Sequence, residues 1–443
     1  MKGSSMLNLK IFLLSIIFCF LCAFSCFAAN NAVDLKTARE FLAGGQPWDA
    51  LTLLQKNHDS QSSNAQEWFL MALAAKACQR PVEASSYLEK VIEIDPKNAG
   101  RAKLELAYLT YSLGDVEKAK LYLNEVKASG PPTRVGENID RFMQLIDTQA
   151  PPKSWRLTTS LGWMYDSNAN AGPDTDSVLM YGLPFVLSDD AKDNEDTAWL
   201  CNIGFDYNKI FTDDIAWQFG LYFSLTDYAS LDNLDSFVLS GSTGPSFRVT
   251  NRFGLSVPLV FDRVRIGHED SYYYCSYGVA PQLHYALTEK LSFNLGSVLS
   301  KKDYHNRSDR NSENYQLSPS LNYQIDNISF ARTGLTLGIQ NSGLSYQDND
   351  LWGLNAMYGR FFWDIIQVTL SLSYFDTDYT GKEEAYSQAR HDKTTRFGMN
   401  ITYHIKLIGT DLVSSLYRTI NHSNLDIYEY DRDQLSFFLR KSF

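Results

Sequence analysis

The chain has 443 residues, of which 40 are Lys or Arg and 51 are Asp or Glu, so its formal net charge is −11. This acidic balance, with a pI near 5.2, argues against a nucleic-acid-binding protein, which needs a basic face. With 44% hydrophobic and 14% aromatic residues the chain is not disordered as a whole, and six cysteines are too few for a disulfide scaffold. The length predicts roughly two or three domains.

The N-terminus has the composition of a secretory signal. Lys2 and Lys10 supply positive charge, the stretch Ile11 to Phe24 is almost entirely apolar, and small residues follow up to Ala29. Because this apolar core is too short for a typical membrane-spanning helix, we predict a signal peptide over residues 1–29 that is removed on export. An uncleaved anchor and a lipid attached to Cys26 are the alternatives.

Residues 30–149 predict a helical repeat domain. Small residues recur in pairs twelve apart, and successive pairs are displaced by 34 and then 35 residues: Ala38 and Ala50, Ala72 and Ala84, Ala107 and Ala119. The pattern resembles the tetratricopeptide repeat, whose paired antiparallel helices need small residues where they cross. A helical bundle without true repeats is the alternative. Either architecture offers a surface for a peptide or a neighbouring domain, and neither supplies catalytic groups.

A proline-containing linker, residues 150–153, ends the helical pattern, and over residues 154–443 the apolar period changes to two. In Ile366 to Tyr374 and in Phe397 to Ile405, apolar residues alternate with small polar ones. Fourteen such segments are expected to begin near residues 155, 197, 215, 235, 253, 272, 291, 314, 328, 351, 365, 394, 411 and 432.

The connections between these segments alternate in length. Turns near residues 251, 289, 326 and 363 are short, whereas the connections 166–196, 302–313, 342–350 and 377–393 are longer and often acidic. This alternation is typical of an outer-membrane β-barrel, in which a closed sheet satisfies every backbone group within lipid. A soluble β-sandwich or lipocalin-like barrel is the rival, but small polar residues on the alternate positions leave it no second apolar layer.

The predicted fold class is therefore α+β multidomain: an N-terminal tetratricopeptide-like α-solenoid followed by a 14-stranded antiparallel transmembrane β-barrel. The barrel would contact outer-membrane lipid. With the short turns on the periplasmic side, the repeat domain would lie in the periplasm.

The last predicted strand supports this interpretation. Leu435, Phe437, Leu439 and the terminal Phe443 share one face, although Lys441 interrupts the pattern. A final aromatic residue after alternating apolar positions resembles the C-terminal signal of bacterial outer-membrane proteins. We therefore expect Phe437, Leu439 and Phe443 to be read by the barrel assembly machinery.

No catalytic chemistry stands out in the sequence. There is no HExxH zinc motif, P-loop, GxSxG elbow or CxxC pair, so we expect no enzyme, cofactor or metal site. His284 and His404 fall on predicted lumen positions as polar fillers. Cys201 and Cys275 fall on predicted outward positions, too many strands apart to form a disulfide.

The stretch after the first strand is the most distinctive. Residues 165–170 read Tyr-Asp-Ser-Asn-Ala-Asn, and Tyr165, Asp166, Asn168 and Asn170 look like the YDSN-x-N motif of the surface lipoprotein assembly modifier family. That resemblance implies a tetratricopeptide domain before a fourteen-stranded barrel. It also implies a role in delivering surface lipoproteins, or related secreted clients, across the outer membrane.

The same stretch opens an unusual loop. Asp166, Asn168 and Asn170 mimic the start of a calcium loop, but the glycine arrives one place late at Gly172; Asx residues that satisfy backbone groups are the competing interpretation. Between residues 166 and 196 there are eight acids and one Lys, and they flank an apolar run from 178 to 187. We expect this run to plug the lumen or contact a client, or else to form an extra hairpin above the barrel.

The leading functional hypothesis is an outer-membrane translocation or assembly factor. The repeats would receive a lipoprotein or secreted protein client, and the barrel would give it passage. The alternative is a porin that exports a polysaccharide or another polymer, since such exporters also join tetratricopeptide repeats to a barrel. Those usually have a strongly charged lumen, whereas the predicted lumen positions here are mainly neutral. A barrel enzyme is a third class without a supporting residue set.

Overall fold

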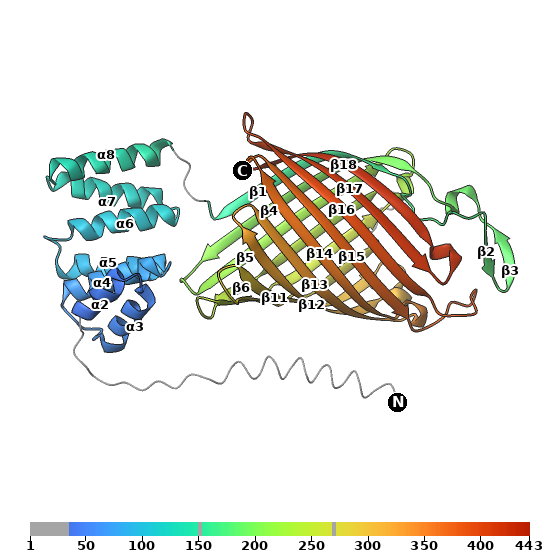
Figure 1. The fold of residues 1–443 in the computed structure, drawn as a ribbon, viewed down its shortest axis with the longest axis horizontal. Helices are drawn as coiled ribbons and strands as arrows, with labels where there is room; N and C mark the ends of the chain where they lie inside the picture. The colour runs from blue at the N-terminus through green and yellow to red at the C-terminus, as the bar shows by residue number, and fades with distance from the viewer. Residues whose placement is uncertain (1–34, 149–152, 268–271) are drawn as a thin grey trace. The chain divides into compact units, whose positions relative to one another are not determined.

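The computed structural model describes residues 35–148, 153–267 and 272–443 (Figure 1). The chain divides into two compact units at Pro152, one helical and one built from strands. The predicted signal peptide, residues 1–29, and most of the predicted linker lie outside the described residues. Of the helices in the described part of the chain, none is long and apolar enough to cross a membrane.

The helical unit is a stack in which each helix packs on the next one in sequence. Its described helices are α2 (Leu35–Ala43), α3 (Pro47–Asn57), α4 (Ala65–Ala77), α5 (Pro81–Ile94), α6 (Gly100–Ser112), α7 (Val116–Ala128) and α8 (Thr133–Thr148). This packing, mainly between consecutive helices and with a smaller contact between α2 and α4, is the arrangement of a solenoid. The assignment of the repeats to the tetratricopeptide type stays a prediction.

The small residues of the repeat lie where the helices meet. Ala38, Ala50, Ala72, Ala84, Ala107 and Ala119 are all at most 1% exposed. The turn inside each repeat also recurs, because Gly45, Gln79 and Gly114 all have a positive φ, at 73°, 58° and 87°. The sequence register that marks the alanines therefore marks the helix ends as well.

We expect Ala84→Leu to destabilise the helical unit. Ala84 is completely buried in α5, and the added side chain has no space to occupy without shifting a neighbouring helix. Overpacking of this kind costs about 1–3 kcal/mol. Urea unfolding, followed through the helical circular-dichroism signal, measures the change. Ser86→Leu on the exposed side of α5 is the control and should stay within about 0.5 kcal/mol of wild type.

Cys78 follows α4 and is only 5% exposed. Burial raises the pKa of its thiol to about 11, so the reactive thiolate is scarce at neutral pH. We expect iodoacetamide to alkylate Cys78 about a hundredfold more slowly than an unstructured cysteine. The measurement uses purified residues 30–443 with Cys201 and Cys275 replaced by serine. Equal rates before and after unfolding in urea would contradict the prediction.

The second unit is a closed antiparallel barrel. Its strands are β1 (Trp155–Asp166), β4 (Asp196–Ile210), β5 (Ile215–Tyr228), β6 (Ser236–Arg248), β7 (Phe253–Ser256), β8 (Leu259–Ile266), β9 (Tyr274–Val279), β10 (Gln282–Ala286), β11 (Leu291–Tyr304), β12 (Ser312–Asp326), β13 (Ser329–Ser342), β14 (Asn349–Phe362), β15 (Ile366–Tyr379), β16 (His391–Ile405), β17 (Thr410–Ser423) and β18 (Tyr430–Ser442). β1 pairs with both β4 and β18, and so the sheet has no free first or last edge.

This sheet contains 16 segments, but β7 with β8 and β9 with β10 are halves of single strands. The fourteen predicted strands are thus confirmed, each beginning within three residues of its expected start. The two breaks fall at Pro258 and Pro281, which have no N–H to donate to a ladder. Their carbonyls still accept: Ala280 donates to Pro258 and Ser297 donates to Pro281, both at 2.9 Å.

The two faces of the barrel differ as alternation predicts. Ser160, Asn202, Tyr222, Ser240 and Asp262 lie side by side on adjacent strands and line a lumen cavity of about 640 Å³. On the opposite face, large apolar side chains such as those of Leu161, Trp199, Leu221, Leu370 and Phe397 are exposed. An apolar outer wall around a polar interior is the architecture that spans a membrane with strands.

Candidate functional site

The residues of the 165–170 motif lie where the barrel closes. Tyr165 and Asp166 end β1, and β1 pairs with β18, so the motif sits beside the seam between the first and last strands. Asp166 is 0% exposed and Asn168 is 2% exposed, which places both among the most deeply buried polar residues in the barrel's described part. Tyr165 faces outward, and its hydroxyl donates to Glu195 at 2.6 Å.

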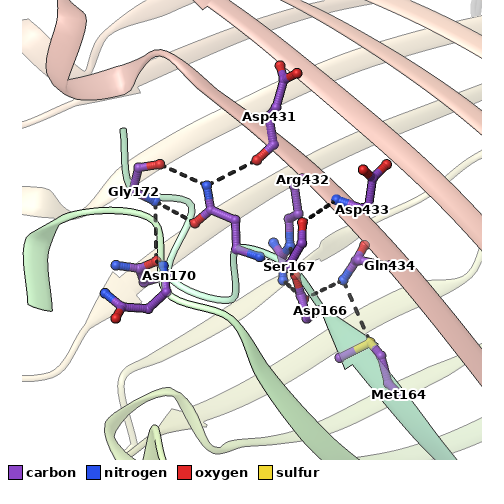
Figure 2. A network of polar contacts seen from close by, with 11 residues as sticks. Met164, Asp166, Ser167, Asn170, Gly172, Asp431, Arg432, Asp433 and Gln434 are labelled. Atoms are coloured by element: carbon purple, nitrogen blue, oxygen red, sulfur yellow. Dashed lines mark hydrogen bonds and ion pairs between the residues drawn. The ribbon is translucent and has the colours of Figure 1, made fainter. Parts of the chain in front are cut away.

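Asp166 forms an ion pair across this seam with Arg432 of β18 (Figure 2). Nε of Arg432 lies 2.9 Å from Oδ1 and 3.0 Å from Oδ2 of the carboxylate, and Nη2 lies 2.5 Å from Oδ2. The Gln434 amide adds a bond to Oδ2 at 2.9 Å. The Asn168 backbone N–H adds one to Oδ1 at 3.2 Å. A buried carboxylate needs such compensation, because it has lost its water shell.

Asn168 connects the loop after β1 to the same seam. Its side-chain Nδ2 donates to the carbonyl of Gly172 at 2.8 Å and to that of Asp431 at 3.1 Å. Its Oδ1 accepts from the Gly172 N–H at 2.9 Å. Ser167 completes the connection, since its N–H donates to the carbonyl of Asp433 and its hydroxyl accepts from the Asp433 N–H. We call Asp166, Ser167, Asn168, Arg432 and Gln434 the seam clasp.

Asn170 holds the far end of the loop. Its Nδ2 donates to the carbonyls of Lys192 and Asp190, and its Oδ1 accepts from the Asn194 N–H at 3.0 Å. The oxygens that a calcium loop would present are therefore engaged by protein donors, and those of Asp166 face a guanidinium. The geometry fits the Asx interpretation and does not fit a calcium loop.

Sequence reasoning missed two of the five residues of the seam clasp. Arg432 and Gln434 are 266 and 268 positions from Asp166, and only closure of the barrel makes them neighbours. A signal was present: both fall on lumen-facing positions of the last strand, where an arginine inside a barrel needs a counter-charge.

Two of the predicted C-terminal signal residues lie on the outer face of β18, and Phe443 follows the end of this strand. Phe437 and Leu439 are exposed on the barrel exterior, and the Phe443 N–H donates to the Leu157 carbonyl at 2.8 Å. The last residue therefore also belongs to the β1–β18 seam. Recognition of these residues by the assembly machinery stays a prediction.

Some other polar groups on the inner wall are also paired. His404 and Arg440 both contact Asp411, at 2.8 and 2.9 Å, and His284 contacts Asn294 at 2.7 Å. Among the described residues, Asp376, Asp378 and His391 are close enough to hold a metal ion. His391 lies 2.9 Å from Asp376, so an ion pair accounts for their proximity when the imidazole is protonated.

The closed sheet of fourteen strands, with its apolar exterior and polar lumen, defines an outer-membrane β-barrel protein that also carries a helical domain. Residues 155–443, which are the whole barrel, match the family described as surface lipoprotein assembly modifier. The chain belongs to this family.

Solved structures of other barrels are similar in outline. A Pseudomonas aeruginosa FadL homologue is 9% identical with a TM-score of 0.40, and the match covers 66% of this chain and 90% of the homologue's chain. The outer membrane channel DcaP of Acinetobacter baumannii is 11% identical with a TM-score of 0.41, and the match covers 65% of this chain and 96% of the DcaP chain. These likenesses are too distant to bear on function. None of the curated proteins matches the sequence significantly.

Proposed function

We propose that this protein delivers lipoprotein or secreted protein clients to the bacterial cell surface. The observation that carries the proposal is the family match over the complete barrel, which includes the motif residues of the seam clasp. The long loops are strongly acidic and the opposite turns are short, which favours a cell-surface position for the loops and a periplasmic position for the helical unit.

The helical unit offers a surface suited to a client. Lys76 of α4 lies over the ring of Tyr108 of α6, at 4.6 Å, and Tyr108 remains 52% exposed. Arg101 lies over the ring of Phe69 at 5.0 Å. Exposed aromatic rings beside cations are common in protein-binding surfaces. We propose that α4 and α6 engage the client before it reaches the barrel.

Export of a polymer is the alternative. A polyanion would need a lumen with unbalanced positive charge, but the arginines at Asp166 and Asp411 are neutralised by their partners. A protein client passing in extended form makes no such demand.

Surface proteolysis tests the proposal. Candidate lipoproteins are expressed in three strains: the wild type, a strain that lacks this gene, and the deletion strain carrying the gene on a plasmid. External protease should digest the client only when the protein is present. If every candidate is equally digested in all three strains, the proposed function is wrong.

A further inference from the structure

The loop after β1 contains a small hairpin outside the barrel wall. β2 (Ser177–Met180) and β3 (Leu183–Val186) pair only with each other, and Figure 1 shows them projecting beyond the end of the barrel where the long loops gather. Of the three expectations for this apolar run, the structure therefore shows a hairpin beyond the barrel. The run does not fill the lumen.

One face of the hairpin is anchored through Val178 of β2, although Phe185 and Leu183 on that side remain 42% and 61% exposed, and the other face is open. Val178 is 3% exposed, and the Tyr181 N–H donates to the carbonyl of Ala385 at 2.7 Å, which ties the hairpin to the loop between β15 and β16. The alternate side chains are free of the barrel: Leu179 is 62% exposed, Tyr181 64% and Val186 84%. Pro184 stands opposite Leu179 on this open face. A contiguous apolar surface of this kind marks an interaction site.

Carboxylates flank the hairpin in the loop that carries it. Asp174, Asp189, Asp190, Asp193 and Glu195 are exposed in the same loop. Lys192 is the sole cation among residues 166–196, and it is shared by Asp176 at 2.7 Å and Asp189 at 3.2 Å. The loop that carries the apolar surface is therefore strongly negative, and we call its exposed carboxylates the rim.

This charge pattern selects among possible occupants. Anionic lipid headgroups would be repelled by the rim, and a second copy of the hairpin would bring two negative rims together. A strand added to the outer edge of β3 would meet Pro184, which has no N–H to donate. What fits is a segment that contacts the hairpin through its side chains and carries apolar and basic residues.

We propose that the open face of the β2–β3 hairpin binds a basic, apolar segment of the exported client at the cell surface. This inference rests on the proposed function, because it names the chemistry of the client that the barrel delivers. The rim attracts the segment, and Leu179, Tyr181 and Val186 then hold its apolar side chains.

Peptide binding to the full-length protein in zwitterionic lipid nanodiscs tests this proposal. The probes are three fluorescent peptides of equal length that alternate Lys with Val, Glu with Val, and Lys with Ser. We expect the Lys/Val peptide to bind most tightly and to weaken as salt is added. Leu179→Ser with Val186→Ser should weaken its binding about tenfold or more. Leu407→Ser with Ile408→Ser alters two exposed apolar residues in a short turn and should leave binding unchanged.

Each result bears on one claim. Equal binding of the Lys/Val peptide by the hairpin variant, or equal binding of the Glu/Val peptide by the wild type, overturns the proposal. Phosphatidylglycerol vesicles that bind through Leu179 and Val186 overturn it as well, because they would make the face a membrane contact. If client digestion in the proteolysis assay does not depend on the gene, the proposed function is wrong but the peptide measurements still stand. The two failures are therefore distinguishable.

Discussion

We expect Asp166→Ala to lower the free energy of unfolding of the barrel by about 3–5 kcal/mol. The substitution leaves the Arg432 guanidinium at the seam without its counter-charge, and it removes the acceptor for Gln434 and for the Asn168 backbone. Arg432→Ala should have a comparable effect, since it leaves a fully buried carboxylate unpaired. Urea unfolding in detergent, followed by the heat-modifiable shift of the barrel on gels, measures both.

Asp411→Ala is the matched control. Asp411 pairs with Arg440 across β17 and β18, but that pair is partly exposed to the lumen, and its loss should cost no more than about 1 kcal/mol. The double variant Asp166→Leu with Arg432→Met should recover most of the stability, because it removes both charges together. If Asp166→Ala costs no more than Asp411→Ala, the seam clasp does not hold the barrel closed.

The second large effect is expected at Gly353 of β14. Gly353 lies directly opposite Phe375 of β15, and the phenyl ring covers the space that a Cβ atom at 353 would occupy. We expect Gly353→Ala to displace the ring and to destabilise the barrel by about 1–3 kcal/mol. Gly162 and Phe438 repeat this arrangement at the seam.

Gly296→Ala is the control for that measurement. Gly296 also faces the lumen in mid-strand, but the nearest atom to an added Cβ is the Ser318 carbonyl oxygen at 3.9 Å, an ordinary contact. The free energy of unfolding of the Gly296→Ala variant in the same urea series should match that of the wild type. Equal losses at Gly353 and Gly296 would show that chain flexibility, and not the ring, explains the effect.

Much of this architecture could be predicted from local patterns. The spacing of the alanines located the helix crossings, since all six are buried, and the period of two located all fourteen strands. Both predictions succeed because the periodicity of a helix or a strand is a property of neighbouring residues. The breaks at Pro258 and Pro281 were not predicted. The two halves β7 and β8 pair with the same neighbour, β6, so alternation alone cannot distinguish them from one uninterrupted strand.

The candidate site was predicted only in part. Asp166, Asn168 and Asn170 stand out in the sequence, but their partners Arg432 and Gln434 do not. The apolar run at 178–187 was expected to enter the lumen or to form a hairpin, and composition could not choose between them. The choice depends on contacts with the loop between β15 and β16, about 200 positions later, such as the bond from Tyr181 to Ala385.

The sequence by itself determined the two units, the strand number and the polar face of each strand, because these follow from spacing along the chain. Only the tertiary structure decided which residues meet at the seam and that the hairpin keeps an open apolar face. The seam requires the first and last strands to pair, and the hairpin is placed by its contact with the loop between β15 and β16. Closure of the sheet thus brings together residues that no local pattern relates.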